Sequence, residues 1–279
     1  MLGGSGQLGG DLTDAARRRG DVVTALGHSA CDITDATAVR RAITASLADI
    51  VINAAAWTRV DAAEDHEDEA EAVNATGAGI VAAECTAAGA RLCHVSTDYV
   101  FDGTATAPID EDAAPNPRSA YGRTKLHGEE AVRAACADHL IVRTGWLYGR
   151  RGPNFVLTML RLAAERPQVR VVDDQYGAPT WSGHLAPAVL RLTEIAPPGT
   201  YHLSSSGDTT WHGLALAAIR ARGLTTDVIP ITTAEYPTPA SRPAYSVLDN
   251  RRWRELGEPP LPAWEAGLAA YLRELDAGR

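Results

Sequence analysis

The fold is decided by the stretch Gly3-Gly4-Ser5-Gly6-Gln7-Leu8-Gly9, at the start of the chain. Its glycines follow a G-x-x-G-x-x-G spacing directly ahead of a helical pattern. Glycine at these positions allows a tight turn and lets backbone N–H groups approach a pyrophosphate at the helix N-terminus. The stretch therefore predicts a dinucleotide-binding loop, with cofactor contacts from Gly3, Gly6, Gln7, Leu8 and Gly9.

A strand should lead into such a loop, but only Met1 and Leu2 precede Gly3. We therefore expect the first strand to be truncated, either because the start codon is placed late or because the chain has been shortened. A central strand of the sheet would then be missing, and folding or cofactor binding would be weakened.

Outward from the loop, short apolar runs alternate with helical patterns as far as about residue 150. This rhythm predicts an α/β fold with a doubly wound, mostly parallel Rossmann sheet and helices on both faces. The expected strands are 22–26, 49–54, 91–95 and 140–143, and the expected helices are 11–19, 35–47, 67–88 and 119–137.

After residue 150 the pattern loosens and proline and glycine become more frequent. Residues 1–150 are therefore predicted to form the NAD(P)-binding domain. Residues 151–279 should form mainly a smaller, discontinuous substrate-binding lobe, with some segments returning to the Rossmann domain. The expected elements are helices at 154–165, 181–195, 211–222 and 262–277, strands at 169–173 and 200–204, and a loop at 230–243.

Composition excludes several classes of protein. A net charge of −9 does not provide the basic surface that nucleic acid requires in a partner. No apolar run approaches the roughly 20 residues of a membrane span, and no secretory signal is visible. The four cysteines form no CxxC pair and the eight histidines no HxxxH pair. We therefore predict reduced thiols in a cytoplasmic protein, without a metal site.

Of the 26 basic residues, only Lys125 is a lysine, and the other 25 are arginines. A GC-rich genome explains the general bias toward arginine, but the single exception needs a chemical reason. Lys125 lies four residues after Tyr121. Arginine stays protonated near neutral pH, whereas the pKa of a lysine shifts readily. Lys125 is therefore a candidate catalytic residue.

Thr97 follows an apolar run and should lie at the carboxyl end of a strand, where open α/β sheets bind their ligands. Tyr121 and Lys125 begin a helical stretch, and their i, i+4 spacing puts them on one helix face. Hydride reduction of a ketone leaves an alkoxide that a tyrosine hydroxyl can protonate. A neighbouring ammonium is expected to lower the phenol pKa from about 10. We predict Tyr121 as proton donor, Lys125 as its modulator and ribose ligand, and Thr97 as the residue that holds the carbonyl oxygen. The alternative is a packed tyrosine beside a surface lysine.

The segment after the second expected strand bears on the choice of cofactor. An NAD-selective site usually has an acidic residue there for the ribose 2′-hydroxyl. This chain instead has Gly27-His28-Ser29. No carboxylate would repel a 2′-phosphate, and His28 or Ser29 could contact it. The cofactor is therefore expected to be NADPH, with NADH as the alternative.

Several further motifs occur in a characteristic order over nearly the whole chain. With this set, the sequence resembles the dTDP-4-dehydrorhamnose reductase family of the extended short-chain dehydrogenase/reductase superfamily. The motifs are Gly6-Gln7-Leu8-Gly9, Asn53-Ala54-Ala55-Ala56, Ser96-Thr97-Asp98-Tyr99-Val100-Phe101, Tyr121-Gly122-Arg123-Thr124-Lys125, Arg143-Thr144-Gly145-Trp146-Leu147-Tyr148, Asn154-Phe155, Val172-Asp173-Asp174-Gln175-Tyr176-Gly177-Ala178-Pro179-Thr180 and Arg242-Pro243-Ala244-Tyr245-Ser246-Val247-Leu248-Asp249.

The resemblance implies a dTDP-linked 4-keto-6-deoxysugar as substrate and assigns further residues to the site. One residue departs from the family pattern: Gly183 replaces an acidic residue associated with a magnesium-bridged dimer in some relatives. No metal is therefore predicted, and a homodimer stays an open possibility. The implied contacts are Gly6 and Gln7 at the pyrophosphate, Asp32 and Ile33 at the adenine, Ala55, Ala56 and Trp57 in the inner cofactor groove, Asp98 and Trp146 at the sugar, and Asn154 and Arg242 at the nucleotide side.

Two other functions are compatible with parts of this sequence. A sister reductase of antibiotic sugar pathways, such as a dTDP-dihydrostreptose synthase, would use the same residues on another 4-keto sugar. A non-catalytic relative that regulates a partner enzyme, as the methionine adenosyltransferase β subunit does, would not need a catalytic set. The presence of Thr97, Tyr121 and Lys125 argues against the second alternative, and gene neighbourhood would discriminate the first.

Overall fold

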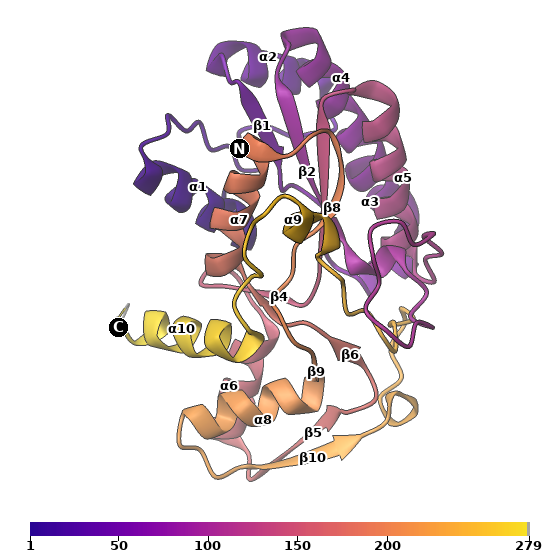
Figure 1. Ribbon diagram of the computed structural model, residues 1–279. Coiled ribbons are helices and arrows are strands. Elements are labelled where there is room, and N and C mark those ends of the chain that lie inside the picture. The colour runs from indigo at the N-terminus through magenta and orange to yellow at the C-terminus, as the bar shows by residue number, and fades with distance from the viewer. Residues whose placement is uncertain (278–279) are drawn as a thin grey trace.

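The computed structural model describes residues 1–277 and is organised around a parallel four-stranded sheet (Figure 1). The strand order is β1-β2-β3-β8, and all three pairings are parallel. The predicted α/β class and parallel sheet are confirmed. The strands are β1 (Ile50–Asn53), β2 (Arg91–Thr97), β3 (His139–Thr144) and β8 (Gly199–His202).

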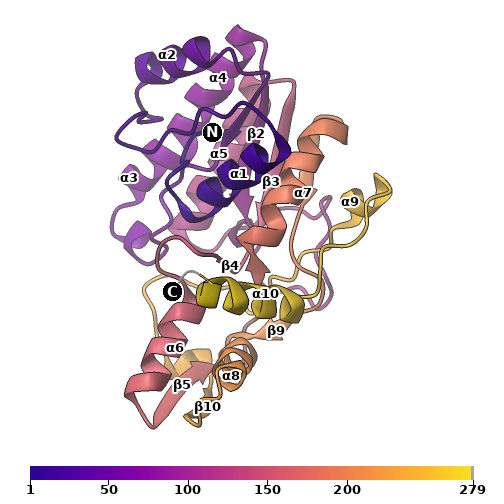
Figure 2. The ribbon, with the colours of Figure 1, turned by 90° about the vertical axis from the view of Figure 1, so that its left-hand side faces the viewer.

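Helices cover both faces of this sheet because successive strand residues point to opposite sides and are apolar on both. Ile52, Cys93 and Val142 pack with the helices of one face. Their neighbours Val51, Leu92 and Ile141 pack with those of the other. Figure 2 shows the two helix layers. The first layer is α1 (Gln7–Arg19) and α7 (Ser182–Ile195), and the second is α2 (Ala36–Ser46), α4 (Ala78–Ala88) and α5 (Ala120–Ala135).

The strand expected at residues 22–26 is not formed, so this prediction is wrong. Only Leu26 makes a bridge, to Leu2, which also bridges to Asn53 on its other side. Val22 is fully exposed. A strand exists through its ladder of hydrogen bonds to a neighbour, and here the neighbouring chain is two residues long before the glycine loop begins. Segment 22–26 therefore has only the bridge from Leu26 to Leu2 and forms no ladder.

The helix expected at 67–88 is interrupted. It consists of α3 (Glu67–Glu71), a π-helical turn (Ala72–Gly77) and α4. Single π turns inside helices are often found at functional sites. This turn carries Asn74, whose side chain contacts the loop after β1.

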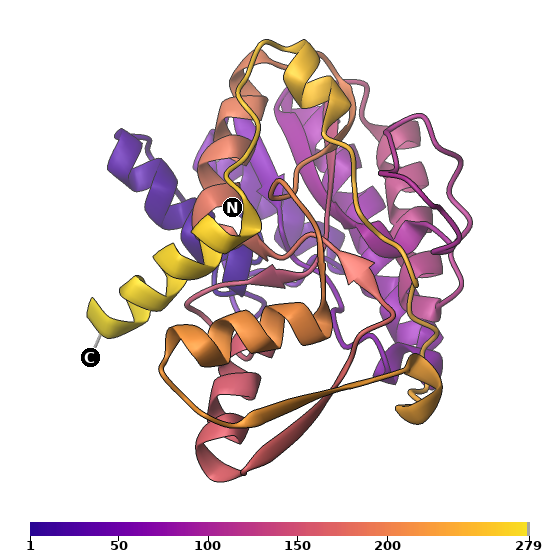
Figure 3. The same ribbon diagram turned by 60° about the horizontal axis from the view of Figure 1, so that its bottom comes forward.

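The second half of the chain forms a smaller lobe, at the bottom of Figure 1 and in front in Figure 3. Two of its elements, α7 and β8, return to the Rossmann sheet. Residues 230–243 are not all loop as predicted, because β10 continues through Pro230 to Ile231. Proline is tolerated at the edge of a sheet, and β10 pairs only with β5. The other elements are β4 (Leu147–Tyr148), α6 (Phe155–Glu165), β5 (Gln168–Val172), β6 (Tyr176–Gly177), β7 (Thr180–Trp181), β9 (Thr209–Thr210), α8 (Trp211–Ala221), β10 (Asp227–Ile231), α9 (Arg251–Glu255), α10 (Trp264–Ala277) and 3-10 turns at Ala62–Glu64, Asp98–Val100 and Thr233–Glu235.

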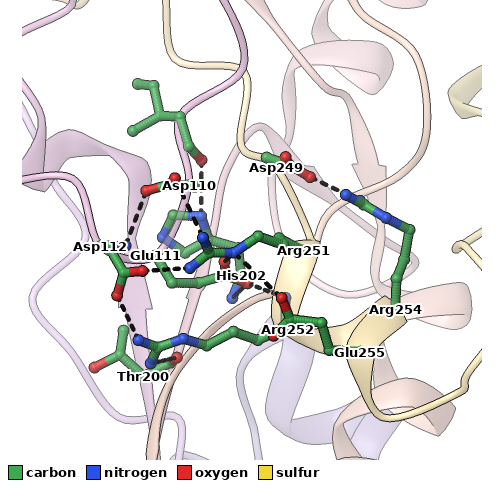
Figure 4. Close-up of polar contacts among 11 residues, drawn as sticks. Asp110, Glu111, Asp112, Thr200, His202, Asp249, Arg251, Arg252, Arg254 and Glu255 are labelled. Atoms are coloured by element: carbon green, nitrogen blue, oxygen red, sulfur yellow. Dashed lines mark hydrogen bonds and ion pairs between the residues drawn. The ribbon is translucent and has the colours of Figure 1, made fainter.

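A charged network fixes the connection between β2 and α5 to the far end of the chain (Figure 4). Asp112 pairs with Arg251 and, at 2.6 Å, with Arg252. Buried Glu111 accepts the backbone N–H of Arg252 at 3.0 Å, and burial raises its pKa. This connection has Thr97 at one end and Tyr121 at the other, so the network restrains the segment between two site residues.

Among residues 1–277, no helix is long and apolar enough to cross a membrane.

Candidate active site

A cavity of about 950 Å³ lies where the carboxyl ends of the parallel strands meet the lobe. Open α/β sheets bind ligands at this edge. The cavity brings together most of the residues that the sequence singled out. On its wall are Gly3, Gly6, Gln7, Leu8, His28, Asp32, Ile33, Ala55, Ala56, Trp57, Thr97, Asp98, Tyr121, Lys125 and Trp146.

The glycine loop has the shape that a pyrophosphate requires. Gly3 has φ +73°, and a Cβ on it would lie 2.6 Å from the backbone nitrogen of Ala55. A Cβ on Gly9 would lie 2.1 Å from the Gly3 carbonyl oxygen, so Gly9 packs the helix against the loop. Helix α1 starts after Gly6 with no side-chain cap and no acidic residue in its first turn. Its leading N–H groups and the positive end of its dipole therefore suit a phosphate.

The cofactor groove continues along the loop after β1, and Asn74 holds this loop in place. The Asn74 side chain accepts the Trp57 N–H at 2.8 Å and donates to the Trp57 carbonyl at 3.2 Å. It also donates to the Thr124 hydroxyl at 3.0 Å on α5. One buried amide thus joins the cofactor loop to the helix that carries Tyr121. Asn74 was not predicted from the sequence, because its contacts lie 17 and 50 residues away along the chain.

Helix α5 places Tyr121 and Lys125 at the cavity. Ser119 caps its start by accepting the Gly122 N–H at 3.1 Å. A Cβ on Gly122 would lie 2.2 Å from the Tyr99 carbonyl oxygen, so glycine allows the helix to approach the end of β2 closely. Thr97, at that strand end, receives the Tyr99 N–H and donates to Asp98 at 3.0 Å. The three predicted catalytic residues therefore share one wall.

The pKa of Tyr121 is raised to about 12, mainly by burial, while hydrogen bonding to Thr97 lowers it and the Asp98 charge raises it further. The sequence led us to expect a lowered value through Lys125, and this prediction is wrong. The Lys125 ammonium is directed elsewhere, so burial dominates. A phenol with this pKa keeps its proton throughout the physiological pH range.

The Lys125 ammonium is buried and is held by residues of β2. Its Nζ donates to the Val95 carbonyl at 2.7 Å and lies 3.4 Å from His94 Nε2. His94 Nδ1 in turn lies 3.3 Å from Asn53 Nδ2. Burial lowers the Lys125 pKa to about 8, against the attraction of Glu129. Burial and Lys125 also push the His94 pKa well below its ordinary value, so His94 is neutral.

Glu129 supplies the opposing charge one helical turn after Lys125. It accepts two bonds from Arg143, at 2.8 and 2.7 Å, and one from Ser96 at 2.6 Å. Burial opposes its ionisation, but the Arg143 hydrogen bonds and charge outweigh burial and lower its pKa. Through these bonds Glu129 connects α5 to Ser96 on β2 and to Arg143 on β3. The i, i+4 spacing from Lys125 to Glu129 was the only signal in the sequence that could have pointed to it.

On the lobe side the cavity wall is aromatic. The indoles of Trp146 and Trp211 stack with centroids 3.5 Å apart and planes 2° apart. Trp146 has φ +49°, in the left-handed region that non-glycine residues rarely occupy. Trp211, which was not predicted from the sequence, donates to Gln175 at 3.1 Å. Asp98 lies nearby, and burial raises its pKa to about 6.

Two predicted substrate contacts do not lie on this cavity wall. Asn154 caps α6 by accepting the Leu157 N–H, and its amide donates to Gly149 and Tyr271. Arg242 forms a two-bond ion pair with Asp61, at 2.9 and 2.8 Å. Both side chains are engaged in these contacts, and their part in substrate binding stays a prediction.

Comparisons with known proteins agree with this geometry. The family described as "RmlD substrate binding domain" matches residues 1–277. The chain is 47% identical to a dTDP-4-dehydrorhamnose reductase of Streptomyces griseus, over 96% of this chain and 90% of that protein. It is 41% identical to a dTDP-4-keto-6-deoxy-D-glucose reductase of Streptomyces niveus, over 99% and 97%.

A solved structure extends this likeness to the coordinates. The dTDP-4-dehydrorhamnose reductase of Bacillus anthracis, in complex with NADP, superposes with a TM-score of 0.95 and 36% identity. The match covers 98% of this chain and 97% of that one. The sequence motifs, the cavity and these relatives agree, and the chain belongs to the dTDP-4-dehydrorhamnose reductase family.

Proposed function

We propose that this protein reduces the 4-keto group of dTDP-4-dehydro-6-deoxy-L-mannose with NADPH and produces dTDP-L-rhamnose. The single observation that carries the proposal is the position of Thr97, Tyr121 and Lys125 on the same cavity as the glycine loop. The relatives named dTDP-4-dehydrorhamnose reductase support the choice of substrate.

When bound along the glycine loop, NADPH supplies the hydride. Thr97 and Tyr121 hold the carbonyl oxygen, and the Tyr121 hydroxyl gives its proton to the alkoxide that forms. Lys125 lies one helical turn after this proton donor, and its proposed role is to bind the cofactor ribose. The phenol is a weak acid in the folded protein, with a pKa of about 12, which suits it to protonate an alkoxide and to stay protonated until then.

The stacked indoles of Trp146 and Trp211 are proposed as the wall against which the sugar packs. Asp98 would accept a sugar hydroxyl. Aromatic faces suit the apolar side of a 6-deoxysugar, whose C6 is a methyl group. Asn154 and Arg242 are kept as proposed contacts on the nucleotide side.

A second candidate is a sister reductase that acts on another dTDP-4-keto-6-deoxysugar. The observation that supports this candidate is the 41% identity to the relative named dTDP-4-keto-6-deoxy-D-glucose reductase. Such an enzyme would use the same Thr97, Tyr121 and Lys125. Antibiotic biosynthesis belongs to this alternative. A non-catalytic regulatory role leaves the catalytic set without a purpose.

One incubation tests both candidates. The protein is mixed with dTDP-4-keto-6-deoxyglucose and NADPH, with and without the 3,5-epimerase, and the product sugar is identified by NMR. Epimerase-dependent oxidation of NADPH with formation of dTDP-L-rhamnose is expected. Reduction without the epimerase would favour the sister reductase. No NADPH oxidation in either mixture would refute a reductase function.

NADPH is expected to be preferred over NADH, because no carboxylate at residues 27–29 opposes a 2′-phosphate. The measurement is kcat/KM with each cofactor at saturating sugar nucleotide. A single lost or gained phosphate contact corresponds to roughly 10-fold. A strong NADH preference would contradict this reading of His28 and Ser29.

The rate should fall as pH rises through about 8. The Lys125 pKa is lowered to about 8, so its ammonium is present below that pH and lost above it. Loss of one required proton gives about a tenfold fall in kcat per pH unit. The measurement is a pH profile of kcat at saturating NADPH. Because an arginine stays charged, the residual activity of Lys125→Arg should not show this decline; an identical decline would assign it to another group.

The cytoplasm is proposed as the location, and a homodimer as the assembly. Support for the first is that all four cysteines are free thiols, as is usual in a reducing compartment. Sedimentation velocity would establish the assembly.

A further inference from the structure

Behind the cavity wall, three buried side chains from three elements contact one another in a row. They are Lys125 of α5, His94 of β2 and Asn53 of β1. The Nε2 atom of His94 lies 3.4 Å from Lys125 Nζ, and its Nδ1 atom lies 3.3 Å from Asn53 Nδ2. Asn53 and His94 are 0% and 1% exposed, and neither lines the cavity. Any part that these two residues have in the reaction therefore acts through Lys125.

The orientation of the Asn53 amide is fixed by the backbone. Its Oδ1 atom accepts the N–H of Ala55 at 3.1 Å. A backbone N–H can only donate, and so can the amide NH₂ group. An exchange of the amide oxygen and nitrogen would therefore place two donors face to face. Because Oδ1 faces Ala55, Nδ2 faces His94 and donates to its Nδ1 atom.

This contact determines which nitrogen of His94 carries the proton. Burial, and after it the charge of Lys125, push the His94 pKa well below its ordinary value, so the ring is neutral. A neutral imidazole has one protonated nitrogen and one that accepts. Since Nδ1 accepts from Asn53, the proton is on Nε2. The Nε2–H group is the one that faces Lys125 Nζ.

An N–H group in this position treats the two forms of Lys125 differently. Its positive end faces the ammonium, which disfavours the charged form. The neutral amine has a lone pair and can accept the Nε2–H. The Val95 carbonyl, 2.7 Å from Nζ, can accept a hydrogen from either form. The His94 tautomer therefore influences whether Lys125 keeps its proton.

The charged groups around α5 leave this contact in place. Burial lowers the Lys125 pKa and the charge of Glu129 raises it, while Glu129 itself is bound by Arg143 and Arg133. Tyr121 keeps its proton, with a pKa of about 12, and is the group on which the Asp98 charge acts. The carboxylates of the helical elements packed against α5 are engaged away from Lys125: Glu64 with the Ala120 N–H, Glu67 with Arg123 and Glu71 with His127.

From these contacts we infer that Asn53 and His94 are positioning residues for Lys125: Asn53 selects the Nε2–H tautomer of His94, and this N–H favours the neutral amine of Lys125. The inference rests on the role proposed above for Lys125 and extends it. The pH at which Lys125 loses its proton, and with it the upper pH limit of turnover, is set in part by two residues outside the cavity.

The tautomer is measured in the unmodified protein by NMR with ¹⁵N-labelled histidine. Correlations from the ring hydrogens distinguish a protonated nitrogen from one that accepts. The signals of His94 are assigned through its own backbone, so no substitution is needed. We expect a protonated Nε2 and an accepting Nδ1 throughout the physiological pH range. A protonated Nδ1 would overturn the proposal.

The protonation of Lys125 is measured directly, because this residue is the only lysine of the chain. Lysine labelled with ¹³C at Cε gives one side-chain signal, which titrates with a midpoint expected at about 8. His94→Leu removes the facing N–H and should raise this midpoint by about one pH unit. If His94 presented a lone pair instead, its loss would lower the midpoint. An unchanged or lowered midpoint therefore contradicts the inference.

Asn53→Asp is the second variant. A carboxylate can accept both the Ala55 N–H and an Nδ1–H, so the substitution should reverse the His94 tautomer. The Lys125 midpoint should rise by more than in His94→Leu, because a negative charge is added as well. The same Nε2–H tautomer as in the unmodified protein would contradict the role of Asn53. If neither variant folds, the tautomer of the unmodified protein decides.

His127→Gln is the matched control on the same helix. The imidazole of His127 is exposed and contacts Glu71 at 3.0 Å. Its substitution should change neither the His94 tautomer nor the Lys125 midpoint. A midpoint that rises as much as in His94→Leu would show that the shift is not specific to the buried contact, and the inference would fail.

The NMR readouts need no substrate, so they are separate from the proposed reductase activity. In His94→Leu the decline of kcat with pH should move upward together with the Lys125 midpoint. If the midpoint moves but the decline of kcat does not, the role of Lys125 in turnover is wrong while the inference about His94 stands. If the midpoint does not move, the inference fails whatever the activity.

Discussion

Tyr121→Phe is expected to lower kcat at least ~10²-fold and to leave the Kd for NADPH nearly unchanged. The substitution removes the one hydroxyl on the cavity wall that is positioned as proton donor and leaves the ring that packs edge-on against Tyr99. Because the ring stays, the fold and the cofactor groove should be preserved. Stopped-flow reduction of the keto sugar and fluorescence titration of NADPH measure the two quantities separately.

Tyr99→Phe is the matched control. Tyr99 also lines the cavity, but its hydroxyl has no part in the proposed chemistry, so turnover should stay within about threefold. If Tyr121→Phe turns over nearly as fast as the unmodified protein, or if the two variants lose activity equally, Tyr121 is not the general acid.

Lys125→Arg is expected to cost about as much turnover, although it conserves the charge. Lys125 is 2% exposed, and its Nζ fits between the Val95 carbonyl and His94. A planar guanidinium is larger and cannot replace a compact ammonium in that position. We therefore expect kcat to fall by roughly 10²-fold, with a weaker affinity for NADPH because the ribose contact is displaced.

Lys125→Met separates size from charge. The methionine side chain fills the same space without the ammonium. Because a buried charge is removed, the melting temperature of the variant should not fall below that of the unmodified protein. If the arginine variant is fully active, the single lysine has no special chemical role. If circular dichroism shows that both variants are unfolded, the pH profile of kcat of the unmodified protein tests the role of Lys125 instead.

The fold was predictable where local pattern and long-range packing agree. Val51-Ile52 and Leu92-Cys93 are apolar on both faces, which only a covered parallel strand explains. The prediction of a strand at 22–26 was wrong for the opposite reason. The apolar pattern of this segment is that of a strand, but only Leu2 pairs with it. The prediction of one continuous helix at 67–88 missed the π turn at Ala72–Gly77. One extra residue in a helix leaves little mark on the spacing of apolar residues along the sequence.

The site was predictable where a motif puts the residues close in sequence. Tyr121 and Lys125 are one helical turn apart, and the glycine loop is continuous. Asn74, His94 and Trp211 were missed because each acts through partners far along the chain. The direction of the Tyr121 pKa shift was wrong because a sequence displays charged neighbours but not burial, and burial is the larger cause here.

The return of β8 to the sheet has a consequence for how the protein is made. Strands β1, β2 and β3 leave the ribosome first, but their fourth neighbour follows only after α6, β5 and α7 have been synthesised. Until then the edge of β3 is open, and an open apolar edge invites aggregation. Non-local pairing of this kind also slows folding. Expression at low temperature, or with a chaperone that shields β3, should therefore raise the yield of native protein.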